Sequence, residues 1–445
     1  MKINTAPLSG FLELLPDEQT EFDRIKNIIQ ETYASFGFTP LDTPAVERSQ
    51  VLMAKGSEET DKQIYFVNNT RGGNQEGKVN ELALRFDLTV PLARYVANNS
   101  HNLVFPFRRQ HIAKVYRGER AQKGRFREFY QCDIDIIGQN SLSTSYDAEM
   151  PSIIYKIFKK LQIGKFKIKI SNRKIFGGVF ESFGITQDTS YVLRIIDKAE
   201  KITPEKFIQE FEELGLSTEQ IKNLQNFISI KGSVKEVLES LENLDVTSQT
   251  FQEGLSELKE VTDMLILLDV DPDYFEIDLA IVRGLDYYTG TVYETVMEDS
   301  RIGSVCSGGR YDNLASSYTD LKLPGVGISI GLSRLFFQLR EHGLLSNLKN
   351  GVSDVIVMPN DNTNISTAIK AANQMREKGI NVDILFQEMP IKKKFAYIDK
   401  QNTPYTIVVK TEKNGNEVLS FQYKQEKNII KEVLDIQDII SKIKL

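Results

Sequence analysis

Arginine, carboxylate and amide side chains recur at places in the sequence where they could bind a polyphosphate beside a small zwitterion. A planar guanidinium pairs with phosphate or carboxylate oxygens through two parallel N–H donors. Carboxylate and amide oxygens can in turn accept hydrogen bonds from an ammonium group. The arginines with suggestive neighbours are Arg117, Arg120, Arg125, Arg283, Arg310 and Arg334. The acid, hydroxyl and amide groups near them are Asp87, Thr89, Gln131 and Asp135.

Other familiar chemistries find little support in the sequence. It contains no GxxxxGK[ST], GxGxxG or HExxH motif, so the common phosphate-loop, dinucleotide and zinc-protease interpretations lapse. The three histidines do not cluster, and no Ser/His/Asp arrangement can be argued. Chemistry at phosphorus depends mostly on alignment and charge stabilisation, so the absence of an obvious nucleophile is expected.

Strands must position most of these side chains. In ELALRFDLT, 81–89, leucines and Phe86 alternate with Arg85, Asp87 and Thr89, which predicts a half-buried strand with a polar face. Two antiparallel strands joined by a basic loop are predicted between His111 and Gly138. Counting by twos puts Arg117 and Glu119 on one face of the first strand. The same count puts Gln131, Asp133 and Asp135 on one face of the second.

The remaining elements follow from hydrophobic periodicity. Residues 17–36 predict a helix that stops at Gly37, with its apolar stripe at Phe22, Ile25, Ile29, Tyr33 and Phe36. Residues 173–271 have a charged, helical texture that suggests an insertion, and strand patterns then return up to about residue 340. Segment 341–352 is a plausible linker. Alternating strand and helix patterns follow, typical of a small α/β domain with a largely parallel sheet.

Composition restricts the class of protein. The chain has 445 residues with 41% hydrophobic and 26% charged residues, as in a soluble globular protein of about three domains. The two distant cysteines support neither a disulfide framework nor a zinc site, and a reducing compartment fits them best. The first residues do not resemble a signal peptide, and the sequence lacks the roughly 18 apolar residues of a membrane span. We therefore expect a cytosolic protein.

Charge is unevenly distributed along the chain. The formal net charge is −6, yet residues 107–127 carry eight Lys and Arg against the single acid Glu119. Such a run is most often a solvated face, but its neighbours here favour an anion-binding role.

Five segments in order closely resemble the class II aminoacyl-tRNA synthetases, and specifically the histidyl-tRNA synthetase family. GFTPLDTPAVE, VYRGERAQKGRFREFYQCDIDIIG and GVGISIGLSRL are similar to the three motifs of the class. RGLDYYTG, 283–290, and SGGRYDNLA, 307–315, are similar to two signatures of the histidine enzymes. The match covers almost the whole chain and is weakest in the insertion, and five motifs in order are much more specific than any one of them.

The resemblance implies residue roles at an ATP site. Arg117 would contact the α-phosphate, Glu119 the adenine amino group, and Phe129 the face of the adenine ring. Arg334 would cover the opposite face of the base and the distal phosphates, and Arg125 belongs to the same site. Mg²⁺ would accompany ATP.

It also implies a histidine site. Asp87, Thr89 and Gln131 would hold the ammonium group, and Asp135 and Tyr288 would read the imidazole, with Tyr287 and Tyr311 lining the pocket. Many members of the family carry Glu where this chain has Asp135. Neutral imidazole offers one donor and one acceptor, so a carboxylate and a phenol hydroxyl can serve both, and no editing domain is needed.

One further arginine carries the catalytic expectation. Arg283 would reach between the histidine carboxylate and the α-phosphate, where the new bond forms, and Arg117 would share this catalytic role.

The implied fold is α+β, with an antiparallel-sheet catalytic domain, a helical insertion and a C-terminal α/β anticodon-binding domain. The expected division is 1–172 and 272–340 for the catalytic domain, 173–271 for the insertion, 341–352 for the linker and 353–445 for the anticodon-binding domain. The implied partners are L-histidine, ATP, histidine tRNA and a second copy of the chain as a homodimer, with no membrane.

Two alternatives remain at this stage. One is a non-catalytic synthetase-like regulatory subunit of histidine biosynthesis, which is unlikely because such paralogues lack the C-terminal domain and tend to lose the ATP-site arginines. The other is a generic RNA-binding module built around the basic hairpin, which leaves the acid and tyrosine positions unexplained.

Overall fold

The structure is a computed structural model that describes residues 3–54, 62–68, 81–199, 202–281, 288–298, 303–345, 351–425 and 428–444. The chain divides into two compact units. The first contains Met1–Leu12 and Ile25–Leu344, and the second contains Glu13–Arg24 and Leu345–Leu445.

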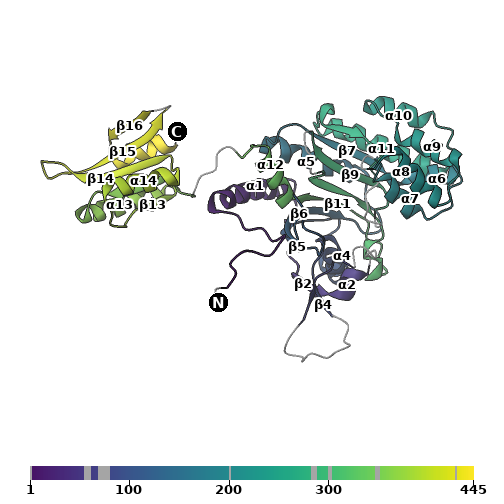
Figure 1. The fold of residues 1–445 in the computed structure, drawn as a ribbon, viewed down its shortest axis with the longest axis horizontal. Coiled ribbons are helices and arrows are strands. Elements are labelled where there is room, and N and C mark those ends of the chain that lie inside the picture. Colours follow the sequence, from purple (N-terminus) through teal and green to yellow (C-terminus); the bar gives the residue numbers. More distant parts are fainter. Residues whose placement is uncertain are drawn as a thin grey trace. The chain divides into compact units, whose positions relative to one another are not determined.

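A large sheet forms the centre of the first unit (Figure 1). In spatial order its strands are β1 (Thr39–Pro40), β5 (Phe107–Tyr116), β6 (Glu128–Ile137), β11 (Gly325–Gly331), β10 (Cys306–Tyr311), β9 (Thr291–Met297), β7 (Phe166–Asn172) and β8 (Phe275–Ile277). Neighbours from β5 to β7 pair antiparallel, and the edge pairs β1–β5 and β7–β8 are parallel. The predicted antiparallel-sheet α+β fold is confirmed.

The hairpin of β5 and β6 is the best-defined prediction of the sequence. Its register pairs Phe107 with Ile137 and Tyr116 with Glu128. Cys132, Ile134 and Ile136 point away from Gln131, Asp133 and Asp135, because successive side chains of a strand face opposite sides. Strand β5 ends at Tyr116, so Arg117 and Glu119 lie in the loop, and their prediction as a strand face was wrong.

Helices cover the apolar face of this sheet. Helix α1 (Pro16–Ser35) buries Phe22, Ile25, Ile29 and Tyr33 as its spacing predicts, and Gly37 follows it with a φ of +79°. The Tyr33 hydroxyl donates to the carbonyl of Cys132 at 2.9 Å, which ties α1 to β6. Helices α5 (Ser145–Leu161) and α12 (Leu332–Glu341) also pack against strands of the sheet.

Segment 81–89 differs from its prediction. Strand β4 covers only Leu82–Leu84 and joins β2 (Val46–Arg48) and β3 (Phe66–Val67) in a small second sheet. Burial does not follow the predicted alternation: Arg85 and Asp87 are buried together with Leu88, whereas Leu82 is 36% exposed. The Arg85 side chain donates to the carbonyls of Thr43 and Lys114, so hydrogen bonds compensate its burial. Thr89 starts helix α4 (Thr89–Asn99), and α2 (Ser49–Met53) precedes this region.

The predicted helical insertion is helical in the structure. Its helices are α6 (Arg173–Ser182), α7 (Thr189–Ile196), α8 (Pro204–Glu213), α9 (Thr218–Ile228), α10 (Val234–Glu242) and α11 (Gln249–Leu267). They gather beside β7 and β9 in Figure 1, and α11 packs against α5, α6 and β7. Several begin with side-chain caps, such as the Ser217–Gln220 and Ser233–Glu236 capping boxes.

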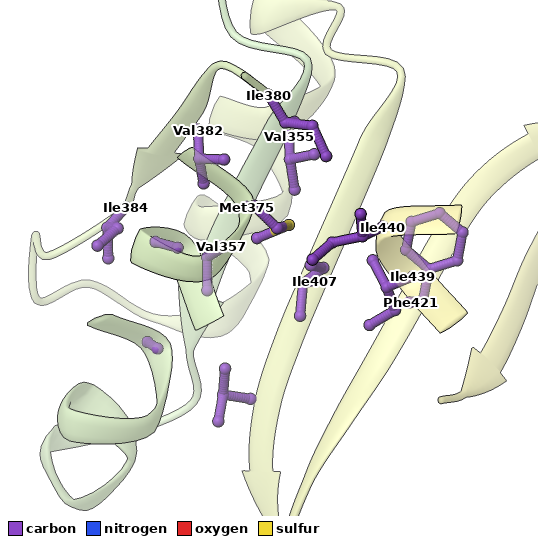
Figure 2. Close-up of a cluster of buried hydrophobic side chains, with 13 residues drawn as sticks. Val355, Val357, Met375, Ile380, Val382, Ile384, Ile407, Phe421, Ile439 and Ile440 are labelled. Atoms are coloured by element: carbon purple, nitrogen blue, oxygen red, sulfur yellow. The ribbon is translucent and has the colours of Figure 1, made fainter. Parts of the chain in front are cut away.

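The C-terminal unit has its own core. Its elements are β12 (Val355–Pro359), α13 (Ile365–Glu377), β13 (Val382–Ile384), α14 (Ile391–Gln401), β14 (Tyr405–Thr411), β15 (Glu417–Gln425), β16 (Asn428–Val433) and α15 (Ile436–Lys444). Figure 2 shows Val357, Met375, Ile407, Phe421 and Ile439 packed between sheet and helices. Strands β13, β12 and β14 are parallel as predicted, but β15 and β16 add antiparallel pairs.

Candidate active site

A cleft with a volume of about 480 Å³ opens in the first unit over the polar face of β6, β10 and β11. Every described residue to which the resemblance gave a role in the ATP or histidine site lines it, namely Asp87, Thr89, Arg117, Glu119, Arg125, Phe129, Gln131, Asp135, Tyr288, Tyr311 and Arg334. Arg283 and Tyr287 lie outside the described residues. Side chains from five separate stretches of sequence therefore meet at one site.

Arg117 is held between two aromatic rings. Its guanidinium carbon lies 4.3 Å from the centre of the Phe86 ring and 5.2 Å from that of Phe129. Its Nε also donates to the carbonyl of Phe86 at 3.3 Å. Cation–π contacts of this kind restrict a long, flexible side chain, so Arg117 is pre-positioned in the cleft.

The hairpin loop that carries Glu119 and Arg125 is fastened to α12. Arg334 Nε donates to the carbonyl of Gly124 at 3.2 Å, and its Nη1 donates to that of Ser304 at 3.0 Å. The ring centres of Phe126 and Phe337 lie 6.0 Å apart, edge to face. Arg125 Nη1 lies 3.5 Å from the Glu119 carboxylate. Arg117, Arg125 and Arg334 thus form a cationic part of the cleft lining.

Buried carboxylates form a second, acidic part of the cleft lining. Asp87 accepts from the backbone N–H of Val90 at 3.0 Å, at the first turn of α4. Burial raises the pKa of Asp87, while the Val90 N–H and the Arg117 guanidinium oppose that rise. Gln131 Nε2 donates to Ser329 Oγ at 2.7 Å, which fixes the amide across β6 and β11.

Asp133 lies between Gln131 and Asp135 on the same face of β6. Its carboxyl group is 2% exposed, and Oδ1 has no hydrogen-bond partner among the described residues. The pKa of Asp133 is raised to about 7, chiefly by burial; Arg109 opposes the rise most strongly, Asp135 adds to it, and the hydrogen bond with Ser329 lowers it. Asp133 therefore changes its charge near neutral pH.

Asp135 accepts a hydrogen bond from one of the tyrosines of the cleft. The Tyr311 hydroxyl donates to Asp135 Oδ1 at 2.6 Å, and burial keeps the pKa of Tyr311 well above its usual value, so the phenol remains a donor. Tyr288 is half-buried against the cluster that contains Tyr311. A side chain at Gly309 would place its Cβ 2.8 Å from the Tyr288 ring, so that glycine makes room for it.

Two predicted phosphate-binding arginines lie elsewhere. Arg310 is 7% exposed and donates to Asp147 at 3.0 Å through Nε and at 2.7 Å through Nη2, so it joins β10 to α5. The Arg310 guanidinium is already engaged in this buried ion pair, and Arg310 does not line the cleft. Arg120 is exposed and does not line the cleft either. Gly308 and Gly309 lie within β10 rather than in a turn.

Sequence reasoning gave no role to three residues of this site. Asp133 had been placed on the correct face of β6, but without a function. Ser329 faces Asp133 in the β6–β11 register, and Arg109 faces Asp135 across the hairpin. Counting residue pairs outward from the hairpin loop would have placed Arg109 opposite Asp135. The pairing of β6 with β11 joins segments almost 200 residues apart and has no local signal.

Two kinds of site find no support in the part of the chain that the structure describes. No group of three His, Cys, Asp or Glu side chains there could hold a metal ion. Within the same residues, none of the helices has both the length and the apolar character to cross a membrane.

Comparison with known proteins agrees with this architecture. A family model described as histidyl-tRNA synthetase matches residues 10–335, and one described as anticodon binding domain matches residues 354–444. A histidine–tRNA ligase of Clostridium tetani is 50% identical, covering 98% of this chain and 97% of that protein.

Solved structures show the same fold. The histidyl-tRNA synthetase of Nostoc sp. PCC 7120 superposes with a TM-score of 0.89 at 39% identity, over 100% of this chain and 99% of that one. An ATP phosphoribosyltransferase regulatory subunit/histidyl-tRNA synthetase from Bacillus halodurans C has a TM-score of 0.74. It is 22% identical and covers 89% of this chain and 97% of that one, so it shows the fold alone.

The antiparallel sheet and the cleft on its polar face are those of a class II aminoacyl-tRNA synthetase, as the motifs predicted. The family match over residues 10–335 and the close relatives then define the subgroup. The chain belongs to the histidyl-tRNA synthetase family.

Proposed function

We propose that this protein is a histidine–tRNA ligase. It activates L-histidine with ATP to form histidyl-adenylate and pyrophosphate, and then transfers the histidyl group to the 3′ end of histidine tRNA. The observation that carries this proposal is a single cleft that is lined both by guanidinium groups and by buried carboxylates. It suits a polyphosphate bound next to an amino acid, while the matched anticodon-binding domain at residues 354–444 suits tRNA.

At the cationic part of the cleft we assign the ATP contacts. Arg117 binds the α-phosphate, Glu119 accepts from the adenine amino group, and Phe129 stacks on the adenine ring. Arg334 covers the other face of the base and reaches the distal phosphates, with Arg125 beside it. The support is that the rings of Phe86 and Phe129 pre-position Arg117, and that two carbonyls hold Arg334. Mg²⁺ enters with ATP as part of the substrate.

At the acidic part of the cleft we assign the histidine contacts. Asp87, Thr89 and Gln131 hold the ammonium group, and Asp135 and Tyr288 pair with the imidazole N–H and nitrogen. Tyr311 orients Asp135, as its hydrogen bond suggests, and Tyr287 shapes the wall. An analogue that lacks either imidazole group leaves a buried partner unpaired, which accounts for selectivity without an editing domain.

Arg283 keeps its proposed catalytic role on the strength of the RGLDYYTG signature. It stabilises the charge between the histidine carboxylate and the α-phosphate, together with Arg117. Replacement of Arg283 by Ala should depress adenylate formation far more than ATP binding. An unchanged rate of adenylate formation would remove it from the mechanism.

We also propose the division into a catalytic domain (1–172 and 272–340), an insertion (173–271) that grips the tRNA acceptor end, a linker (341–352) and an anticodon-binding domain (353–445).

We further propose that the active protein is a cytoplasmic homodimer. Buried free cysteines suit a reducing compartment. Val46, Phe66 and Leu82 expose 36–41% of their surfaces on the small sheet, which suits a covered interface. Sedimentation should give a dimer that Leu82→Asp weakens; a wild-type monomer would refute the assignment.

Histidine-dependent exchange of labelled pyrophosphate into ATP tests the activity directly. We expect exchange with histidine and at least about 10⁴-fold less with other amino acids, because buried polar groups discriminate strongly. No exchange with histidine, or equal exchange with another amino acid, would overturn the proposal. A regulatory subunit would show no exchange, but the cleft arginines and the C-terminal match argue against that role.

A further inference from the structure

Arg109 is a fully buried arginine directly behind the acidic part of the cleft. It lies on β5 opposite Asp135, and its side chain is 0% exposed. Its Nη2 lies 2.6 Å from Asp135 Oδ2 and also donates to the carbonyl of Leu88 at 3.3 Å. Nε and Nη1 have no hydrogen-bond partner among the described residues. A guanidinium buried with so few partners is expensive, which points to a use beyond stability.

The ion pair places the Asp135 carboxylate in one orientation. Arg109 holds Oδ2, and the Tyr311 hydroxyl donates to Oδ1. Gly327 lies against the same oxygen, and a Cβ there would come within 2.2 Å of Asp135 Oδ1. Asp135 therefore sits in a fitted space, with a cation on one side and a neutral donor on the other.

The charges around Asp135 explain why a cation is needed. Two other buried acids, Asp133 and Asp87, belong to the same part of the cleft, and Arg109 acts electrostatically on all three. Burial raises the pKa of Asp135, and Arg109 is the strongest opposing influence, followed by the Tyr311 hydrogen bond. His111, two residues after Arg109 on β5, supplies no second cation, because burial lowers its pKa to about 4.

We propose that Arg109 is a positioning and specificity residue, which keeps Asp135 ionised and aimed so that its carboxylate accepts the N–H of a neutral imidazole. Arg109 does not line the cleft, so it acts through Asp135 and not on the substrate. The Arg109–Asp135 pair is neutral as a whole. It therefore receives an uncharged hydrogen-bond donor without attracting cationic side chains, which a lone carboxylate would favour. This inference rests on the proposed histidine-activating function.

Pyrophosphate exchange by the full-length protein tests the inference, with Michaelis constants measured separately for histidine and ATP. In Arg109→Gln we expect the KM for histidine to rise about 100-fold and the KM for ATP to stay within about threefold, because breaking a buried charge pair is costly. The histidine kcat/KM of wild-type protein should be flat above pH 7. That of Arg109→Gln should reach its plateau at a higher pH than that of wild type, because Asp135 without the guanidinium ionises at a higher pH.

Arg85→Gln is the matched control. Arg85 is also a buried arginine, 6% exposed, that pairs with an acid and backbone carbonyls, but it does not line the cleft or contact Asp135. It should lower the unfolding temperature without a selective change in the histidine KM or its pH profile. If the two variants lose activity in the same way, with both Michaelis constants raised together, Arg109 is merely structural and the inference fails.

Two further variants keep the test decisive. Arg109→Gln combined with Asp135→Asn should be no worse for histidine than Asp135→Asn alone, since both act through one interaction; multiplicative losses would overturn the inference. If Arg109→Gln does not fold, Arg109→Lys decides. Lysine retains the positive charge, so the pH profile of kcat/KM for histidine should stay flat while only the KM for histidine rises, by about fivefold. An unchanged KM for histidine, or an equal rise in the KM for ATP, overturns the inference.

These outcomes separate the inference from the proposed function. Wild-type protein that shows no histidine-dependent exchange would refute the function itself. Wild-type protein that exchanges normally, with Arg109 variants that bind histidine unchanged at every pH, would refute only the role of Arg109.

Discussion

Asp133 shows how one buried side chain can link the cleft to pH. It is enclosed by β6 and β11, has one oxygen without a partner among the described residues, and shares Arg109 with Asp135. An acid with a folded-state pKa near 7 binds a proton that the unfolded chain, with a value of about 3.9, has already released. Asp133 therefore costs stability increasingly as pH rises from about 4 to 7, and this cost is constant above that range.

Replacing Asp133 with Asn should remove this dependence. Relative to wild type, Asp133→Asn should be more stable at pH 8 than at pH 5 by on the order of 2 kcal/mol, measured by chemical unfolding at both values. Asp245→Asn controls for the loss of one charge, because Asp245 is exposed. Parallel pH profiles for wild type and Asp133→Asn would contradict the assigned pKa.

Helix packing in the insertion depends on glycines at one crossing. Gly178 of α6 faces α11, where an added Cβ would lie 2.6 Å from the backbone nitrogen of Phe251. Gly254 of α11 has the reciprocal arrangement, with its Cβ position 2.8 Å from the nitrogen of Ile175. The two helices approach so closely that no side chain fits between them. Gly177 is adjacent, yet its Cβ position is an ordinary 3.6 Å from the Thr250 methyl group.

This difference predicts opposite effects for neighbouring substitutions. Gly178→Ala should destabilise the protein by about 1–3 kcal/mol through overpacking. Gly177→Ala should be neutral or stabilising by up to about 1 kcal/mol, because alanine is the better helix former. Both changes alter helix propensity equally, so the difference in unfolding midpoint isolates the steric term. Equal unfolding midpoints for the two variants would show that α11 can move away from α6 and make room for the methyl group.

Helix α14 separates two kinds of lysine that look alike in sequence. Lys392 and Lys393 are exposed, as expected for a solvated helix face. Lys394 is 6% exposed and donates to the carbonyl of Pro359 at 2.7 Å, so it does not belong to that solvated face. Helical periodicity turns Lys394 toward the end of β12, where its ammonium group satisfies a carbonyl.

Substitution should distinguish the buried Lys394 from the exposed Lys392 and Lys393. Lys394→Met should lower the unfolding midpoint of the C-terminal unit, because the Pro359 carbonyl loses its partner. Lys392→Ala with Lys393→Ala should leave the midpoint unchanged and raise the KM for tRNA about threefold to tenfold in aminoacylation assays. An unchanged KM for tRNA in the double variant would show that Lys392 and Lys393 do not contribute to tRNA binding.

The formal net charge of the chain is −6. Residues 173–271 carry 19 Asp and Glu against 10 Lys and Arg, whereas residues 353–445 carry 14 Lys and Arg against 12 Asp and Glu. Binding of tRNA must therefore rely on local positive surfaces, and such binding weakens as salt displaces the phosphate contacts. The cleft proposed for histidine and ATP has buried carboxylates, and salt screens buried charges less than exposed ones.

Salt should accordingly separate the two half-reactions. Between 50 and 200 mM salt, the KM for tRNA should rise about tenfold or more, while the KM for histidine in pyrophosphate exchange should change less than about threefold. Parallel salt dependence of the two reactions would argue against a mainly electrostatic grip on tRNA.

Local sequence determined the pieces of this protein. The β5–β6 hairpin, helix α1 and the helical texture of the insertion follow from periodicities of two and 3.6 residues, which depend on near neighbours alone. The order of five motifs was sufficient for the family. Candidate residues of the cleft could be named because the resemblance supplied their positions.

Only the tertiary structure decided how these pieces meet. In sequence, Arg310 and Arg117 look equally suited to binding phosphate. In the structure, Arg310 forms a buried ion pair with Asp147, whereas the Phe86 ring positions Arg117 in the cleft. Segment 81–89 alternates like a strand, yet hydrogen bonds from Arg85 to distant carbonyls allow this arginine to be buried. The Arg109–Asp135 pair likewise depends on the cost of burying charge, which is set by surroundings that local patterns do not encode.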